Sequence, residues 1–141
     1  MKRVMALDVG FKKIGIAVSD PLLLTANPHS IIYRKSNKET FSKLLELIEK
    51  LDVGKIIIGI PISSEGKETK MAEKIKKFAL KLDSFLKERG KKIEIVFIDE
   101  SYSSLEAKEL CRFLGKTEKE EIDDIAAALM LKEWLKVSTM Y

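Results

Sequence analysis

The predicted fold of this chain follows from the segment RVMALDVGFKKIGIAV, residues 3–18. It contains two short apolar runs, at 3–7 and 14–18, on either side of the turn-prone sequence GFKK at 10–13. Two such runs joined by a short glycine-containing turn predict a β-hairpin. HSIIY, at 29–33, is expected to add a third strand. The chain is therefore expected to begin with antiparallel strands.

Helical and strand patterns alternate after this opening. Ser36 and Glu39 match a capping box, and apolar residues then recur at helical spacing to about residue 51. KIIIGI, at 55–60, is a continuous apolar run, as expected of a central strand covered on both faces, and Pro61 ends it.

A second helix and a fifth strand follow. The helix is basic and amphipathic, spans about 69–89 and is ended by Gly90. IEIVFI, at 93–98, predicts another buried strand.

Two more capping boxes predict the last two helices, which run to about residues 113 and 136. The boxes pair Ser103 with Glu106 and Thr117 with Glu120. The order of elements predicts an α/β fold with a five-stranded mixed sheet flanked by helices. Its first three strands would be antiparallel and the others parallel. We expect a single domain over residues 1–141.

Composition narrows the class of protein. The chain has 34% charged residues, and no apolar run approaches the ~20 residues that span a membrane. An aspartate and a glycine occur too early for a signal peptide. The single cysteine, Cys111, cannot form an internal disulfide. A cytoplasmic protein with no membrane partner is therefore expected.

Charge is distributed unevenly along the chain. Residues 67–92 contain ten basic and four acidic residues, whereas residues 93–141 contain six and eleven. A basic middle suits a protein that binds a polyanion. A solvated, lysine-rich helix surface is the simpler explanation, and charge alone favours it. The candidates for contact with a nucleic-acid backbone are Lys12, Lys13, Ser63, Ser64, Lys67 and Lys70.

Acidic residues occur at two predicted strand ends. Asp8 lies where the first strand meets its glycine turn, and Asp99 and Glu100 follow the strand at 93–98. Each has an ordinary alternative explanation, because aspartates stabilise turns and acidic residues favour helix N-termini.

Asp123 and Asp124 are harder to explain structurally. If Thr117 caps the last helix, both lie beyond the positions where aspartate acts as a cap. They point away from the predicted solvent face, which is defined by Lys132, Glu133 and Lys136. A carboxylate facing the core is costly unless it is paired or binds a metal.

The acidic clusters together predict a metal site. Ligands bind at the carboxyl ends of parallel strands in open α/β sheets. Oxygen ligands without a cluster of histidines or cysteines favour Mg²⁺ or Mn²⁺ over zinc. Two such ions can activate water and stabilise the leaving oxygen of a phosphodiester. The lone histidine, His29, is expected to pack within its strand, and neither Phe11 nor Tyr102 is favoured as a base-stacking residue.

Four segments resemble the YqgF/RuvX family of Holliday junction resolvase-like and ribosomal RNA-processing nucleases. They are LDVGFKKIGIAVSDP (7–21), IIIGIPISSEG (56–66), IDESYSSLEA (98–107) and IDDIAAALMLKEWL (122–135). The resemblance implies a ribonuclease H-like three-layer fold. It also implies catalytic and metal-binding carboxylates at Asp8, Glu100 and Asp123, with Asp124 as a backup ligand and Asp99 supporting them.

The sequence departs from the family pattern at Ser101 and Lys13, where the family usually has arginine. Loss of a fork-shaped phosphate donor at Ser101 weakens the expected grip on the substrate.

The resemblance implies a metal-dependent nuclease that processes the 5′ end of pre-16S ribosomal RNA during ribosome biogenesis. The alternatives are a Holliday junction resolvase and a non-catalytic nucleic-acid-binding assembly factor. An actin-like nucleotide-binding fold is a weaker rival, because it needs two lobes. The sequence leaves open a homodimer, association with a ribosome precursor, and the choice between structured RNA and branched DNA.

Overall fold

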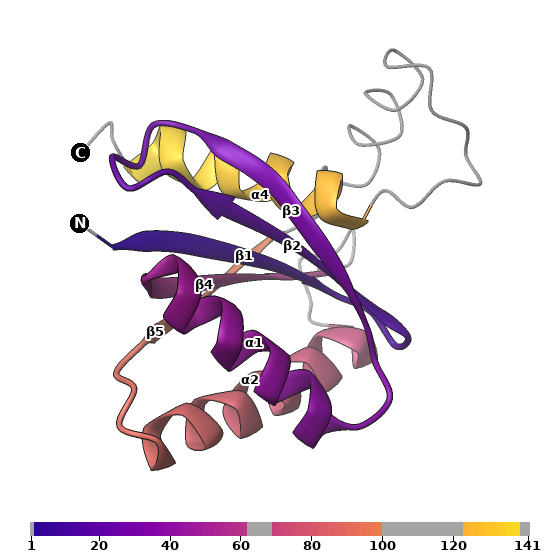
Figure 1. Ribbon diagram of the computed structural model, residues 1–141. Helices are drawn as coiled ribbons and strands as arrows, with labels where there is room; N and C mark the ends of the chain where they lie inside the picture. Colours follow the sequence, from indigo (N-terminus) through magenta and orange to yellow (C-terminus); the bar gives the residue numbers. More distant parts are fainter. Residues whose placement is uncertain (1, 62–68, 100–122, 139–141) are drawn as a thin grey trace.

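The computed structural model describes residues 2–61, 69–99 and 123–138 (Figure 1). The elements in chain order are β1 (Arg3–Val9), β2 (Lys13–Ser19), β3 (Ala26–Tyr33), α1 (Asn37–Leu51), β4 (Val53–Ile60), α2 (Lys70–Glu88), β5 (Glu94–Asp99) and α4 (Asp123–Ser138). The predicted helix that would start at Ser103, and the predicted cap at Thr117, lie outside the described residues.

The strands form one five-stranded sheet in the order β3-β2-β1-β4-β5. β1 pairs antiparallel with β2, and β2 pairs antiparallel with β3. β4 is parallel to both of its neighbours, β1 and β5. The predicted mixed sheet is confirmed, with its antiparallel half formed by the first three strands.

Helices cover both faces of the sheet and make three layers (Figure 1). Met5 and Leu7 of β1 belong to the core shared with α1 and α2, whereas Val4 and Ala6 belong to the core shared with α4. This alternation follows from the two-residue period of a strand. β1 and β4 are thus covered on both faces, as the apolar run at 55–60 predicted.

Local signals placed the helix ends correctly. The Ser36 side chain accepts a hydrogen bond from the Glu39 backbone N–H at 3.2 Å, and Thr69 caps α2 in the same way through Ala72. Gly90 follows α2 with φ of +74°, a conformation that favours glycine.

Two predictions about the outer strands were wrong. β5 was expected to be buried, but it is an edge strand of the described sheet and Phe97 is 37% exposed. His29 was expected to pack, but it is exposed on β3, the other edge strand, where its Nδ1 lies 2.8 Å from the Ser30 Oγ. The edge position also explains why Pro28 is tolerated within β3.

Asp20 organises the loop between β2 and β3, at the end of the sheet opposite to the β1–β2 turn. Its Oδ1 accepts the backbone N–H groups of Leu24 at 2.7 Å and Thr25 at 2.8 Å. The bond from the Thr25 N–H is the main reason why the pKa of Asp20 lies below its ordinary value of 3.8. Leu23 adopts a positive φ of 59° within this loop.

We expect Asp20→Ala to lower the thermal unfolding temperature near neutral pH. Because the folded-state pKa is depressed, the stabilisation by Asp20 is complete above its unfolded value of 3.8. It is lost as the pH falls through the lower folded value, so the difference in unfolding temperature between the wild type and the variant should narrow as the pH falls below 3.8. Asp20→Asn is the control, because its amide oxygen still accepts hydrogen bonds without titrating. If the difference in unfolding temperature between the wild type and Asp20→Ala stays the same in acid, this account is contradicted.

None of the described helices combines the length and the apolar character needed to span a bilayer.

Candidate functional site

Asp8 lies at the carboxyl end of β1 on the face of the sheet that α4 covers. Val4 and Ala6 pack against α4, and the strand alternation puts Asp8 on the same face. The side chain is half-buried. The predicted position of Asp8 at the end of the first strand is therefore observed, and the structure adds that α4 covers this face.

Two glycines flank Asp8 on the neighbouring strands. Gly15 is the direct partner of Asp8 on β2. On β4, Gly59 follows Ile58, the partner of Leu7, and so lies beside Asp8. Glycines inside strands occur where a ligand or another backbone approaches closely. The sheet therefore carries no side chain on either side of the carboxylate.

The start of α4 lies over the same end of β1. Near the other end of the helix, the Trp134 ring lies 5.1 Å from Nζ of Lys55, which pairs with Val4 at the start of β1. From Trp134 back to Asp124 a helix rises about 15 Å, and from Val4 to Asp8 a strand extends about 13 Å. Figure 1 shows α4 starting, in orange, at the side of the sheet where β1 ends.

The last helix therefore brings one of the predicted acidic pairs toward Asp8. Asp123 is the first residue of α4, and its side chain lies outside the described part. Asp124 is half-buried, and its Oδ1 accepts the Ile125 backbone N–H at 3.0 Å. The predicted solvent face is confirmed, because Lys132, Glu133 and Lys136 are exposed.

The third acidic cluster follows β5. Asp99 is the exposed last residue of that strand, and Glu100, the next residue, lies outside the described residues. β5 is parallel to β4, and Ile60 pairs with Asp99. The three clusters thus come from the carboxyl ends of β1 and β5 and from the start of α4.

Among the predicted nucleic-acid-binding residues, three are described. Lys12 is exposed in the β1–β2 turn, Lys13 is half-buried at the start of β2, and Lys70 is exposed at the start of α2. Ser63, Ser64 and Lys67 lie outside the described residues, as does Ser101.

Arg34 holds the β1–β2 turn, a role that sequence reasoning missed. Its backbone N–H donates to the Lys12 carbonyl at 2.8 Å, and its guanidinium donates to the Gly10 carbonyl at 2.6 Å. The guanidinium also donates to Asn37 Oδ1 at 3.3 Å and lies 4.9 Å from the Phe78 ring centroid. Burial lowers the pKa of Arg34. No local signal could reveal a contact between residues so far apart in the sequence.

The donors at this end of the sheet fit a hard cation. Asp8 and Asp124 are carboxylates, the ligands that Mg²⁺ and Mn²⁺ prefer. Among the side chains that the structure describes, no three metal-binding groups gather. Two of the three expected ligands, Glu100 and Asp123, have side chains outside that set.

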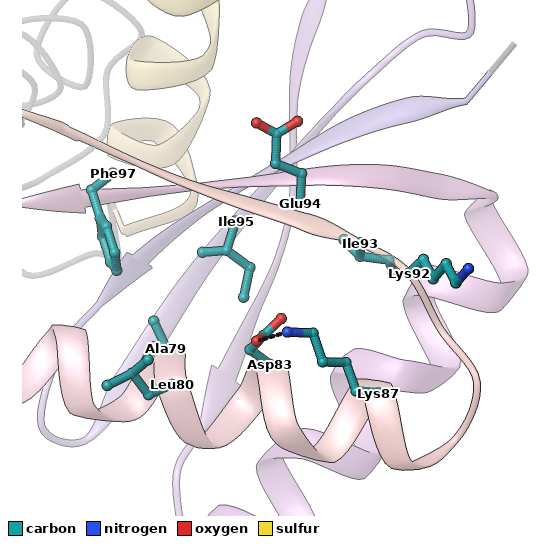
Figure 2. A pocket seen from close by; sticks show the side chains of 9 residues that line it. All are labelled: Ala79, Leu80, Asp83, Lys87, Lys92, Ile93, Glu94, Ile95 and Phe97. Atoms are coloured by element: carbon teal, nitrogen blue, oxygen red, sulfur yellow. Dashed lines mark ion pairs between the residues drawn. The ribbon is translucent and has the colours of Figure 1, made fainter.

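A separate groove lies between α2 and β5 (Figure 2). Leu80, Ile95 and Phe97 provide its apolar lining, and Asp83 and Lys87 form an ion pair of 2.9 Å beside them. Ile95 packs with the core on the α1 and α2 side of the sheet. The groove is therefore on the opposite face from Asp8, and none of the predicted site residues that the structure describes lines it.

The arrangement of strands matches solved Holliday junction resolvases. The RuvC of T. thermophilus, solved in complex with a Holliday junction substrate, aligns with a TM-score of 0.57 over 99% of this chain and 96% of its own, at 17% identity. The yeast mitochondrial Holliday junction resolvase aligns with a TM-score of 0.56 over 98% of this chain and 79% of its own, at 14% identity. The fold is thus the ribonuclease H-like fold of the RuvC type.

Sequence comparison is more specific. The family model RuvX, described as Holliday junction resolvase, matches residues 2–137. A relative from Sulfurihydrogenibium sp. is 38% identical over 96% of this chain and 90% of its own. A relative from Syntrophomonas wolfei is 40% identical over 94% of this chain and 93% of its own. Both are named "Putative pre-16S rRNA nuclease". The chain belongs to the RuvX family.

Proposed function

We propose that this protein is a metal-dependent nuclease that hydrolyses phosphodiester bonds, with pre-16S ribosomal RNA as the favoured substrate. The observation that carries the proposal is the half-buried Asp8 at the carboxyl end of β1, with glycines on both neighbouring strands and the start of α4 above it. The names of the curated relatives favour ribosomal RNA among nucleic acids.

The proposed metal ligands are Asp8, Glu100 and Asp123, with Asp124 as the alternative to Asp123. Mg²⁺ or Mn²⁺ held there would supply an activated water and stabilisation of the leaving oxygen. The role of the chain itself is to keep the carboxylates at fixed positions on a rigid sheet and helix. Asp124 already shares one oxygen with a backbone N–H, which supports ranking Asp123 first.

Lysines of the β1–β2 turn and of α2, the helix whose Lys74 lies 4.7 Å from the Phe11 ring centroid in that turn, would bind the phosphate backbone. Lys12 is exposed in the turn that follows Asp8, and Lys70, Lys74 and Lys77 lie at helical spacing on the exposed surface of α2. Phosphate contacts of this kind position a nucleic acid without reading its sequence.

Holliday junction cleavage is the second candidate function. It is supported by the description of the RuvX family and by the fold shared with junction resolvases. A resolvase must cut two strands symmetrically, so this candidate also requires a homodimer. A non-catalytic ribosome assembly factor is the third reading, supported by Ser101 in place of arginine. We place the protein in the cytoplasm, associated with ribosome precursors.

A cleavage assay with three substrates separates these functions. Purified protein would be given a single-stranded RNA, a pre-16S ribosomal RNA fragment and a four-way DNA junction, with Mg²⁺, Mn²⁺ or EDTA. We expect cleavage of RNA that EDTA abolishes. Paired symmetric nicks in the junction would favour the resolvase instead. Binding without cleavage of any substrate would overturn the nuclease proposal in favour of the assembly factor.

Charge reversal on α2 should weaken binding and flatten its dependence on salt. Each lost contact with a phosphate of a single strand reduces the slope of log affinity against log salt by about 0.7. We therefore expect Lys70→Glu/Lys77→Glu to reduce that slope by about 1.4, measured by fluorescence anisotropy with a labelled RNA.

The matched control is Lys43→Glu/Lys50→Glu, which makes the same charge change at the same spacing on the exposed surface of α1. If both double variants lower affinity and slope equally, α2 has no special role in binding.

A further inference from the structure

Phe11 is an exposed aromatic residue at the tip of the β1–β2 hairpin. Its side chain is 66% exposed, although the turn residues beside it need only a glycine and polar groups to form the bend. The turn itself therefore does not require the ring, which is largely exposed.

The turn that carries Phe11 is held rigidly. The Gly10 N–H donates to the Lys13 carbonyl at 2.8 Å, and Arg34 donates to the carbonyls of Gly10 and Lys12. A Cβ added at Gly10 would lie 2.9 Å from the Lys13 carbonyl oxygen, so this close turn requires glycine. A ring held in place before binding loses little conformational entropy when a ligand stacks on it.

Two lysines lie near the ring. The Lys74 ammonium of α2 lies 4.7 Å from the Phe11 ring centroid, and Lys12 is exposed at the next position of the turn. An aromatic face bordered by cations is what proteins use to bind single-stranded nucleic acids, because the ring stacks on a base while the cations attract phosphates.

The distance between Phe11 and Asp8 suits a base close to the cleaved bond. Phe11 is three residues after Asp8, so their Cα atoms are at most about 11 Å apart. Stacked nucleotides rise about 3.4 Å each along a strand, so this distance spans about three nucleotides.

We infer that Phe11 is a stacking subsite for an unpaired nucleobase, with Lys74 and Lys12 on the adjoining phosphates and Arg34 holding the turn in position. The inference rests on the proposed nuclease function and specifies its substrate as a strand that is unpaired beside the site. It assigns a positioning role to the hairpin, which the sequence alone did not favour.

The test compares Phe11→Leu with Phe11→Trp. Binding would be measured in EDTA, by anisotropy and by 2-aminopurine fluorescence, with a short single-stranded RNA, the matching single-stranded DNA and the RNA duplex. We expect Phe11→Leu to bind single strands about 5- to 100-fold more weakly and to lose the change in 2-aminopurine fluorescence. Phe11→Trp should retain both, and binding of the duplex should change little. A preference for RNA over DNA in the wild type would identify the source of the base.

Phe97→Leu is the matched control, because Phe97 is also an exposed aromatic residue near a lysine, with Nζ of Lys76 5.8 Å from its ring centroid. It lies on β5, which β4 separates from the β1–β2 hairpin in the sheet, and the variant should bind like the wild type. The inference is overturned if Phe11→Leu matches the wild type in affinity and in the change of 2-aminopurine fluorescence. It is also overturned if the substitution weakens the binding of single strands and of the duplex equally. If the wild type binds no nucleic acid, both this inference and the proposed function fail. If the wild type binds but Phe11→Leu binds equally well, the inference alone fails.

Discussion

Asp8→Asn should reduce nuclease activity at least about 100-fold, because the neutral amide loses the charge that holds a divalent cation. The substitution changes shape very little, and the backbone pairing of position 8 with Gly15 does not depend on the side chain. The variant is therefore expected to keep the fold of the wild type.

The measurement pairs initial cleavage rates with thermal unfolding in the same buffer. Asp52→Asn is the matched control, since Asp52 is exposed at the end of α1, has a φ of 52° that asparagine tolerates, and lies beside Arg3 at the opposite end of the sheet. We expect full activity from this control. An Asp8→Asn protein that is folded and cleaves at the wild-type rate would remove Asp8 from the site.

Asp123→Asn and Asp124→Asn should have very different effects. We expect the first to lower the cleavage rate at least about 100-fold, and the second to retain most activity. The reason is that one oxygen of Asp124 already accepts the Ile125 backbone N–H at 3.0 Å, whereas the resemblance to the family assigns the ligand role to Asp123.

Each of these two variants is the other's control, because the substitutions are identical and adjacent in the chain. Rates would be measured across a titration with Mn²⁺, since a weakened metal site can recover part of its activity at high metal concentration. The reverse pattern, with only Asp124→Asn inactive, would move the third ligand by one residue. Full activity in both variants would exclude the start of α4 from the metal site. Glu100→Gln should match the loss in Asp8→Asn.

Much of the fold was predictable because its signals are local. The two apolar runs and the turn within residues 3–18 and the capping box at Ser36 depend on neighbours within a few residues, and the hairpin and the helix start that they predicted appear in the structure. The direction of the strands followed from the same order of elements, because a short turn requires antiparallel pairing and a helical crossover allows parallel pairing. The status of β5 as an edge strand was not predictable, because an apolar run looks the same at an edge and in the centre.

The candidate site was also predictable only in part. The sequence alone indicated the acidic positions, since Asp8 and the pair at Asp123 and Asp124 are carboxylates in otherwise apolar surroundings, where burial is costly without a partner. It could not show that Gly15 and Gly59 lie on either side of Asp8, because strand register is set by pairing across the sheet.

Only the tertiary structure revealed that distant residues hold the β1–β2 turn and the Phe11 ring in it. Arg34 reaches Gly10 across 24 positions of sequence, and Lys74 reaches the Phe11 ring from a different helix. Such contacts depend on how β3 and α2 pack against the sheet, and that packing is a property of the whole core. The sequence by itself determined which segments form strands and helices and which residues carry charge, because backbone hydrogen bonding and periodicity act locally. Tertiary packing decided which of those residues meet at one end of the sheet.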